Sequence, residues 1–211
     1  MTKIISWNVN GIRSNIIDSK KSSFKGNRKI EKDSSLFQII KKYNPDMICF
    51  QETRLDISNT LMFESDKIKE YYPYQYWSSS EGSNARSGNR YSGVSIWSKI
   101  PANQTIIHFD KLLKQEGRFI QLNFDKFILI NTYTPNCGSN FNYRMNIWEP
   151  FICKYLTQLH KKYKKPIIYT GDMNVAQKQD IWFGDLLENR FADESDENIK
   201  KYLEKLIKSK Q

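Results

Sequence analysis

Four polar segments of the sequence each follow directly on a short apolar run, and this pattern constrains the fold more than any other feature. The apolar runs are rich in β-branched and aromatic residues and are too short for helices, so they predict buried strands. A polar side chain at the end of a buried strand lies at the rim of the sheet, where open α/β sheets gather their ligands. Four such strand ends predict one shared site. The apolar runs are residues 3–6, 47–50, 127–130 and 167–170, and the polar segments are residues 7–10, 51–53, 131–136 and 171–174.

Between these runs the chain alternates between strand and helix patterns. A helical pattern at residues 36–40 ends at Asn44-Pro45, and a second at residues 143–163 is stopped by Lys164-Lys165-Pro166. Asp125-Lys126 separates two strands at hairpin spacing. We therefore predict an α/β protein with mixed sheets. Further strands are expected at residues 92–97, 104–109, 119–124 and 127–132, and exposed loops at residues 19–25 and 78–90.

The composition predicts a single domain. The 211 residues, of which 39% are hydrophobic, can bury a substantial core, and no linker divides residues 1–211. The part of the chain that bears the motifs is residues 1–180, and residues 197–209 have the spacing of a terminal amphipathic helix. The sequence contains no long apolar stretch and no secretory leader pattern, which excludes a membrane class and predicts a cytoplasmic or nuclear location. Three cysteines at unrelated spacings indicate neither a disulfide framework nor a zinc site.

The net charge is strongly positive. Lys and Arg number 33 against 23 Asp and Glu, which gives +10 at pH 7. Such an excess attracts polyanions such as nucleic acid. Charge alone leaves open the alternative of a lysine-rich chain with an ordinary solvated surface.

The polar segments carry hard oxygen ligands. Asn8 and Asn10 are two residues apart, as are Asp172 and Asn174, so in extended chain each pair points the same way. Glu52 ends an apolar run and needs a cation or hydrogen bonds to stabilise its charge. Such a set suits Mg²⁺ and phosphate.

Structural roles for the same residues stay open. Gly-Asp is a common turn at the end of a strand, Glu52 could pair with Arg54, and Tyr133 could complete the core. The two histidines, His108 and His160, are expected to be ordinary surface or core residues.

Seven blocks of the chain, covering residues 1 to about 180, resemble the exonuclease III and apurinic/apyrimidinic endonuclease family, within the endonuclease/exonuclease/phosphatase superfamily. The blocks occur in the family's order. Gly-Asp-x-Asn is shared across the superfamily, whereas the first block and the Asn-Val-Ala continuation are typical of the DNA-repair branch. The blocks are Ile5-Ser6-Trp7-Asn8-Val9-Asn10-Gly11-Ile12-Arg13, Gln51-Glu52-Thr53-Arg54, Tyr91-Ser92-Gly93-Val94, Glu116-Gly117-Arg118, Tyr133-Thr134-Pro135-Asn136, residues 144–148 and Gly171-Asp172-Met173-Asn174-Val175-Ala176.

The resemblance implies a two-sheet α/β sandwich and a nuclease dependent on Mg²⁺ or Mn²⁺. It would cleave double-stranded DNA on the 5′ side of abasic sites and would also act on 3′ ends, as an exonuclease or on blocked termini. By resemblance, Glu52 binds the metal with Asn8 and Asn10, while Tyr133, Asp172 and Asn174 are catalytic. The same comparison assigns DNA or phosphate contacts to Arg13, Tyr91, Arg118 and Asn136.

The chain departs from the family after residue 180. The family's Arg-Leu-Asp-Tyr strand and its terminal Ser-Asp-His are not found in this sequence. We therefore expect a C-terminally incomplete sandwich with impaired catalysis, because general acid-base catalysis contributes about 10²- to 10⁴-fold. Two alternatives remain: a catalytically inactive DNA-binding remnant, and an enzyme that acts on RNA or a phosphorylated small molecule. Nothing in the sequence indicates an oligomeric state.

Overall fold

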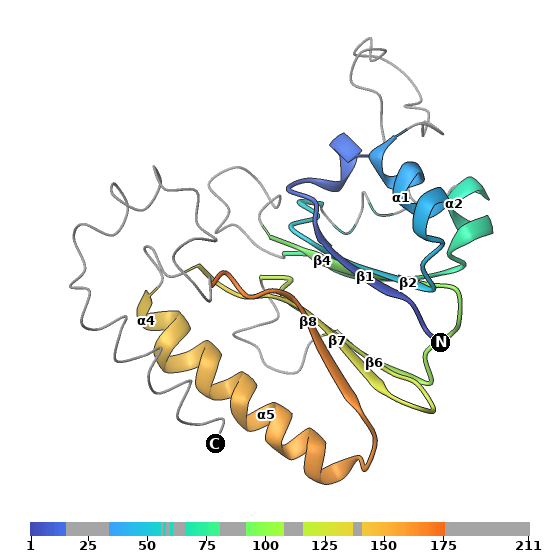
Figure 1. Cartoon of the computed structure of the whole chain (residues 1–211). Helices are drawn as coiled ribbons and strands as arrows, with labels where there is room; N and C mark the ends of the chain where they lie inside the picture. Colours follow the sequence, from blue (N-terminus) through green and yellow to red (C-terminus); the bar gives the residue numbers. More distant parts are fainter. Residues whose placement is uncertain are drawn as a thin grey trace.

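Two four-stranded mixed sheets face each other and carry helices on their outer faces (Figure 1). The computed structural model describes residues 1–15, 34–55, 57, 60, 66–80, 92–107, 116–136 and 141–175. Tyr91, His108, Cys137, the predicted loop at residues 19–25, most of the predicted loop at 78–90 and the predicted helix at 197–209 lie outside the described residues. The two-sheet α/β sandwich expected from the resemblance is confirmed.

The first sheet has the strand order β1-β2-β4-β3. β1 and β2 are parallel, and the other neighbours are antiparallel. All five residues of β2 are buried, which explains why its sequence is almost continuously apolar. The strands are β1 (Ile4–Asn8), β2 (Met47–Gln51), β3 (Tyr74–Ser78) and β4 (Val94–Ser98).

The second sheet follows the chain in the order β5-β6-β7-β8. Asp125-Lys126 joins β6 to β7 in an antiparallel pair, which confirms the predicted hairpin. β7 and β8 are parallel and are connected through the long helix α5. The strands are β5 (Gln104–Ile106), β6 (Phe119–Asn123), β7 (Ile128–Tyr133) and β8 (Ile167–Asp172).

The helices also follow the sequence pattern. α1 ends at Tyr43. The next residue, Asn44, has a φ of 43° and is followed by Pro45. The predicted helix at residues 143–163 is present but begins with a π-helical segment, η4. The helical elements are η1 (Ile12–Asn15), α1 (Ser35–Tyr43), α2 (Asp66–Tyr71), α4 (Phe141–Tyr143), η4 (Arg144–Trp148) and α5 (Glu149–Lys162). Within the described residues, no helix combines the length and the apolar character needed to cross a membrane.

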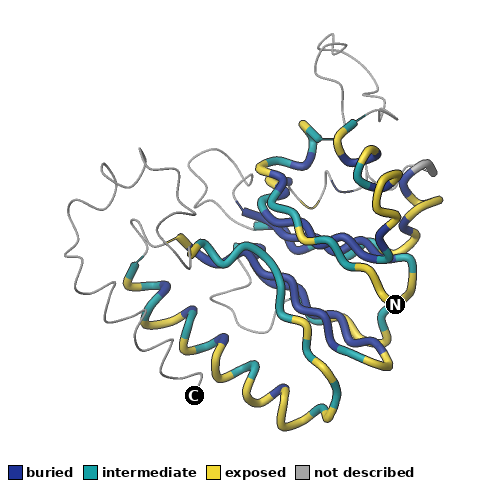
Figure 2. The backbone as a smooth tube through the Cα atoms, in the orientation of Figure 1, coloured by how far each residue is buried: buried dark blue, intermediate teal, exposed yellow. Residues whose placement is uncertain are grey.

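Alternating residues of the strands pack into three apolar layers. In β2, Ile48 and Phe50 pack with α1, while Met47 and Cys49 belong to the layer between the sheets. The third layer packs the outer face of the second sheet against α5. Figure 2 accordingly shows the strands mostly buried and the outer turns of α5 exposed. This alternation fixes which side chains reach the rim.

Several elements and boundaries differ from the prediction. The short segments η1 and α4 were not predicted, and the strand predicted at residues 104–109 ends at Ile106. β3 and α2 were not predicted, because Tyr74–Ser78 combines exposed and half-buried aromatic residues without a clear period and α2 has only six residues. β4 begins at Val94 rather than at residue 92, since Ser92 and Gly93 have φ values of 55° and 87° that extended strand does not permit.

Candidate functional site

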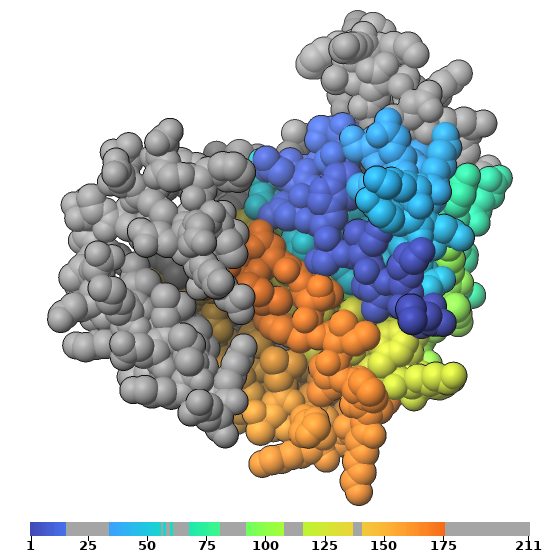
Figure 3. All heavy atoms as spheres, in the orientation of Figure 1, coloured from blue at the N-terminus to red at the C-terminus, as the bar shows by residue number. Residues whose placement is uncertain are grey.

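The four predicted strand ends come together at one rim of the sandwich. Asn8 pairs with Gln51 at the ends of β1 and β2, and Tyr133 pairs with Asp172 at the ends of β7 and β8. The segment at β1 and the β8 strand abut on one face of the molecule (Figure 3). The sheets therefore deliver their polar ends to the same place.

Asn8 links a carboxylate of each sheet. Its Nδ2 donates to Glu52 Oε1 at 3.0 Å and to Asp172 Oδ2 at 2.7 Å. Both bonds share one nitrogen, so the two carboxylate oxygens lie no farther apart than the combined length of these bonds. The Asn8 Oδ1 accepts the backbone N–H of Asn10 at 3.0 Å, and this bond fixes the orientation of the amide. In this arrangement Asn8 positions the two acids, and its amide oxygen would face a metal beside them only after the side chain turned.

Glu52 is held as an ionised carboxylate. Its Oε2 accepts from Arg54 Nη2 at 2.7 Å, so the ion pair left open by the sequence is present. Burial alone would raise the pKa of Glu52, but hydrogen bonds from Asn8, Arg54 and Tyr133 outweigh burial and hold that pKa below its usual value. A charged carboxylate that is 17% exposed is available to a cation.

Tyr133 is a protonated hydrogen-bond donor. Burial makes the largest contribution to raising the pKa of its phenol, and the hydrogen bond to Glu52 raises that pKa further. The Arg118 guanidinium lies 4.8 Å from the centre of the ring and acts in the opposite direction, but the net shift is upward. The phenol therefore keeps its proton at neutral pH and donates to Glu52.

Asp172 and Asn174 form a compact unit after β8. The Asn174 N–H donates to Asp172 Oδ1 at 2.8 Å, and the Asn174 Nδ2 donates to Thr134 O at 2.6 Å. Asn174 also hydrogen-bonds to the Tyr133 phenol. The predicted catalytic residues Tyr133, Asp172 and Asn174 are thus brought together with Glu52 and Asn8.

The predicted DNA contacts are more dispersed. Asn136 is exposed at the end of the segment after β7, Asn10 is exposed after β1, and Arg13 is half-buried on η1. Arg118 is 1% exposed; its Nε pairs with Glu116, and its Nη1 donates to Tyr133 O at 3.1 Å. In this structure Arg118 supports Tyr133, and its contact with DNA stays a prediction.

Backbone strain is concentrated in the same segments. Asn10, Glu52, Arg54 and Asn174 have φ values of 45°, 52°, 51° and 47°. Non-glycine residues in this region cost about 1–3 kcal/mol each and are found at functional sites when the surrounding contacts hold them there. The hydrogen bonds of Glu52 and Asn174 are contacts of this kind.

Sequence reasoning missed a buried amide pair below the rim. Gln51 Nε2 donates to Asn131 Oδ1 at 2.7 Å across the sheets. Asn131 Nδ2 donates to Phe50 O at 2.9 Å and to Ser95 O at 3.0 Å. The available signal was an asparagine directly after the apolar run at residues 127–130 and a glutamine directly after the run at 47–50, because buried amides are retained where they have partners.

The donor set is one that a Mg²⁺ ion accepts. Among the residues that the structure describes, no three His, Cys, Asp or Glu side chains cluster as metal ligands. Mg²⁺ needs only one or two carboxylates, because waters and substrate phosphates complete its coordination. Glu52 would hold such an ion, with Asp172 beside it.

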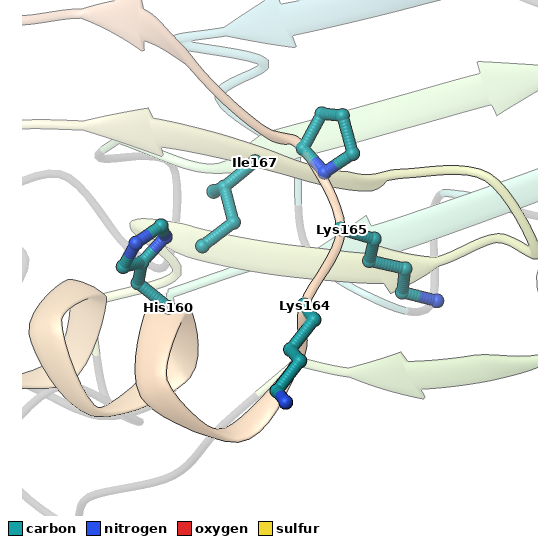
Figure 4. A pocket seen from close by; sticks show the side chains of 5 residues that line it. His160, Lys164, Lys165 and Ile167 are labelled. Atoms are coloured by element: carbon teal, nitrogen blue, oxygen red, sulfur yellow. The ribbon is translucent and has the colours of Figure 1, made fainter.

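His160 lies at the other end of the second sheet. With Lys164, Lys165, Pro166 and Ile167 it lines a hollow of about 480 Å³ where α5 leads into β8 (Figure 4). Ile167 begins β8 and Asp172 ends it, a separation of about 17 Å in extended chain. His160 is therefore outside the site.

The sequence and the fold match known nucleases. Residues 5–190 match the Endonuclease/Exonuclease/phosphatase family. The chain is 32% identical to a DNA-(apurinic or apyrimidinic site) endonuclease of Dictyostelium discoideum, with 84% of this chain and 43% of that protein covered. It is 30% identical to an exodeoxyribonuclease of Bacillus subtilis, with 96% of this chain and 71% of that protein covered.

Solved structures share the fold. A 3′ phosphatase from Neisseria bound to a product DNA hairpin has a TM-score of 0.62 at 19% identity, with 85% of this chain and 60% of that chain covered. An AP endonuclease from Archaeoglobus fulgidus has a TM-score of 0.57 at 24% identity, with the same shares covered. The chain thus spans less than two thirds of the length of several of these relatives. By sequence and by fold, this chain belongs to the Endonuclease/Exonuclease/phosphatase family.

Proposed function

We propose that this chain is a Mg²⁺-dependent DNA-repair nuclease that cleaves the phosphodiester on the 5′ side of abasic sites. The observation that carries the proposal is the Asn8 amide, which holds the Glu52 and Asp172 carboxylates together at 3.0 and 2.7 Å. The relatives named as an AP endonuclease and an exodeoxyribonuclease support DNA as the substrate. The same site would act on phosphodiesters at 3′ ends.

Each side chain has a role in this mechanism. Asp172 accepts the proton of the attacking water, and Asn8 and the Asn174 N–H keep its carboxylate aimed. The phenol of Tyr133 keeps its proton, with which it donates a hydrogen bond to Glu52 in this structure, and it would turn toward the phosphate or the leaving oxygen when substrate binds. The exposed Asn136 amide would donate to phosphate oxygens, and the Asn174 amide would do so by exchanging its contact with Tyr133 for one with the phosphate. When bound at Glu52, a divalent cation supplies positive charge that stabilises the phosphoryl oxygens.

Incision of a duplex with one abasic-site analogue tests the proposal. The wild-type chain should cut with Mg²⁺ and not with EDTA. E52Q and D172N should lower the rate by about 10²-fold or more. E70Q is the matched control, because Glu70 is an exposed carboxylate on α2, away from the rim. The proposal fails if the wild-type chain does not cut, or if E52Q and D172N cut as fast as E70Q.

The net charge of +10 favours one competing function, DNA binding without hydrolysis. Lys and Arg contacts to phosphates would make such binding weaken steeply with salt. Salt-sensitive binding of duplex DNA with no Mg²⁺-dependent product would support this alternative. A parallel panel of RNA and phosphorylated small molecules would detect a different substrate, since the site residues face phosphate rather than bases.

A further inference from the structure

A buried guanidinium joins the two segments that carry the site residues of the second sheet. Arg144 is the first residue of η4, and its side chain is 2% exposed. Its Nη1 donates to Pro135 O at 3.1 Å and to Asn174 O at 2.9 Å, and its Nη2 donates to Met173 O at 2.8 Å. The first carbonyl follows β7 and the other two follow β8. One side chain thus cross-links both strand ends.

The peptide group between Met173 and Asn174 connects this guanidinium to the Asp172 carboxylate. Its C=O accepts from Arg144 at 2.8 Å, and its N–H donates to Asp172 Oδ1 at 2.8 Å. The described residues contain no cis peptide bond, and in a trans peptide the C=O and N–H point in opposite directions. The peptide plane is therefore held from both sides, and a bond to its carbonyl polarises its N–H.

We infer that Arg144 is a positioning residue for Asp172 in the reaction, an inference that rests on the proposed function. Asp172 Oδ1 is held by the peptide that Arg144 orients, and Oδ2 is held by Asn8 from the first sheet. Loss of the guanidinium frees the first of these two contacts. Because Arg144 is buried behind the segment, its loss should slow the chemical step and leave DNA binding almost unchanged.

The geometry requires arginine at this position. The planar guanidinium offers five N–H donors, and at Arg144 they serve carbonyls of two segments and the Glu149 carboxylate, which pairs with Nε at 3.2 Å. Lysine has its three donors on one nitrogen and cannot span both segments. The π-helical turn that begins at Arg144 is a device common at functional sites.

Hydrogen exchange tests the positioning without any need for activity. R144K should speed exchange of the Asn174 amide by about 10-fold or more, because its peptide plane loses one of its two constraints. K154Q is the control, since Lys154 is exposed on α5, and it should leave exchange unchanged. Equal protection of this amide in R144K and in the wild-type chain would overturn the inference. If R144K does not fold, NMR of the wild-type chain decides: slowly exchanging guanidinium protons that couple to the Met173 and Pro135 carbonyls support it, and freely exchanging ones overturn it.

A double-mutant cycle on the abasic duplex tests the link to Asp172. R144K should lower kcat by about 10- to 100-fold and change KM by less than about 3-fold. In a D172N background, R144K should have little further effect, because the group that it positions is already disabled. A full additional loss in D172N would overturn the inference. If the wild-type chain cuts no substrate, the proposed function fails, and the exchange experiment still decides whether Arg144 orients this segment.

Discussion

Replacing Gly171 with alanine should force apart the two strands that end in Tyr133 and Asp172. Gly171 lies in β8 opposite Thr132 of β7 and has a φ of 133°. An added Cβ would lie 2.0 Å from Thr132 O and 2.8 Å from both Thr132 C and Thr132 N. All three are backbone atoms, so no side-chain rotation can relieve the contact and the strand itself must move.

Two costs combine at this position, and a matched variant separates them. A non-glycine residue with such a φ costs about 1–3 kcal/mol. Overpacking against backbone adds about 1–3 kcal/mol. Gly11 has a φ of 102°, but a Cβ there would meet only Arg54 Cδ, at 3.9 Å. G11A therefore has the first cost alone, and G171A should have a free energy of unfolding lower than that of G11A by about 1–3 kcal/mol.

Urea unfolding followed by circular dichroism measures this difference. The folded fraction of G171A should also incise the abasic duplex more slowly than G11A, because Asp172 moves with β8. Equal unfolding free energies for the two variants would refute the steric argument. Equal incision rates would show that β8 accommodates the methyl group without moving its end.

Three further outcomes follow from the site and its support. The pKa of Glu52 is lowered by folding, so its contribution to stability is complete above the ordinary value of about 4.5 and is lost as pH falls through the folded value. E52Q should therefore flatten the pH dependence of the urea-measured unfolding free energy below about pH 5, and an unchanged slope would contradict this. Y133F should slow incision about 10- to 100-fold. Because burial and Glu52 raise the pKa of Tyr133, the wild-type incision rate should show no phenol ionisation up to about pH 10. A fall in the wild-type rate at alkaline pH that is absent in Y133F would be evidence against this. N131A should lower the free energy of unfolding by about 2–4 kcal/mol, because three buried hydrogen bonds lose their partner, whereas the exposed amide lost in N103A should cost little.

Much of the fold could be predicted because strand periodicity is local. The run at residues 47–50 is β2, and its alternation of Ile48 and Phe50 with Met47 and Cys49 sends side chains to two different layers. β3 could not be predicted in this way, because Tyr74–Ser78 owes its strand conformation to pairing with β4. The sequence predicts a strand at residues 92–97 but does not show that residues 74–78 pair with it.

The predicted convergence of strand ends was correct, but the contacts within the site required the structure. The sequence indicates Glu52, Tyr133 and Asp172, because each is a polar residue close to the end of an apolar run. The sequence does not show that the NH₂ group of Asn8 faces both acids, because that contact depends on how the two sheets pack against each other. The sequence comparison assigned Arg118 a DNA contact and gave Arg144 no role, and only their burial and contacts show that they support their neighbours.

The described chain passes from the first sheet to the second once, at residues 99–103, so each sheet is built from one continuous stretch. Glu52 belongs to the earlier stretch and Asp172 to the later one. A ribosome that has finished the first stretch has therefore produced one acid without its counterpart. Under the proposed function, a chain that contains only the first stretch would hold Glu52 without Asp172 and would lack a complete site. The junction at residues 99–103 therefore divides the described chain into two stretches, neither of which holds both acids.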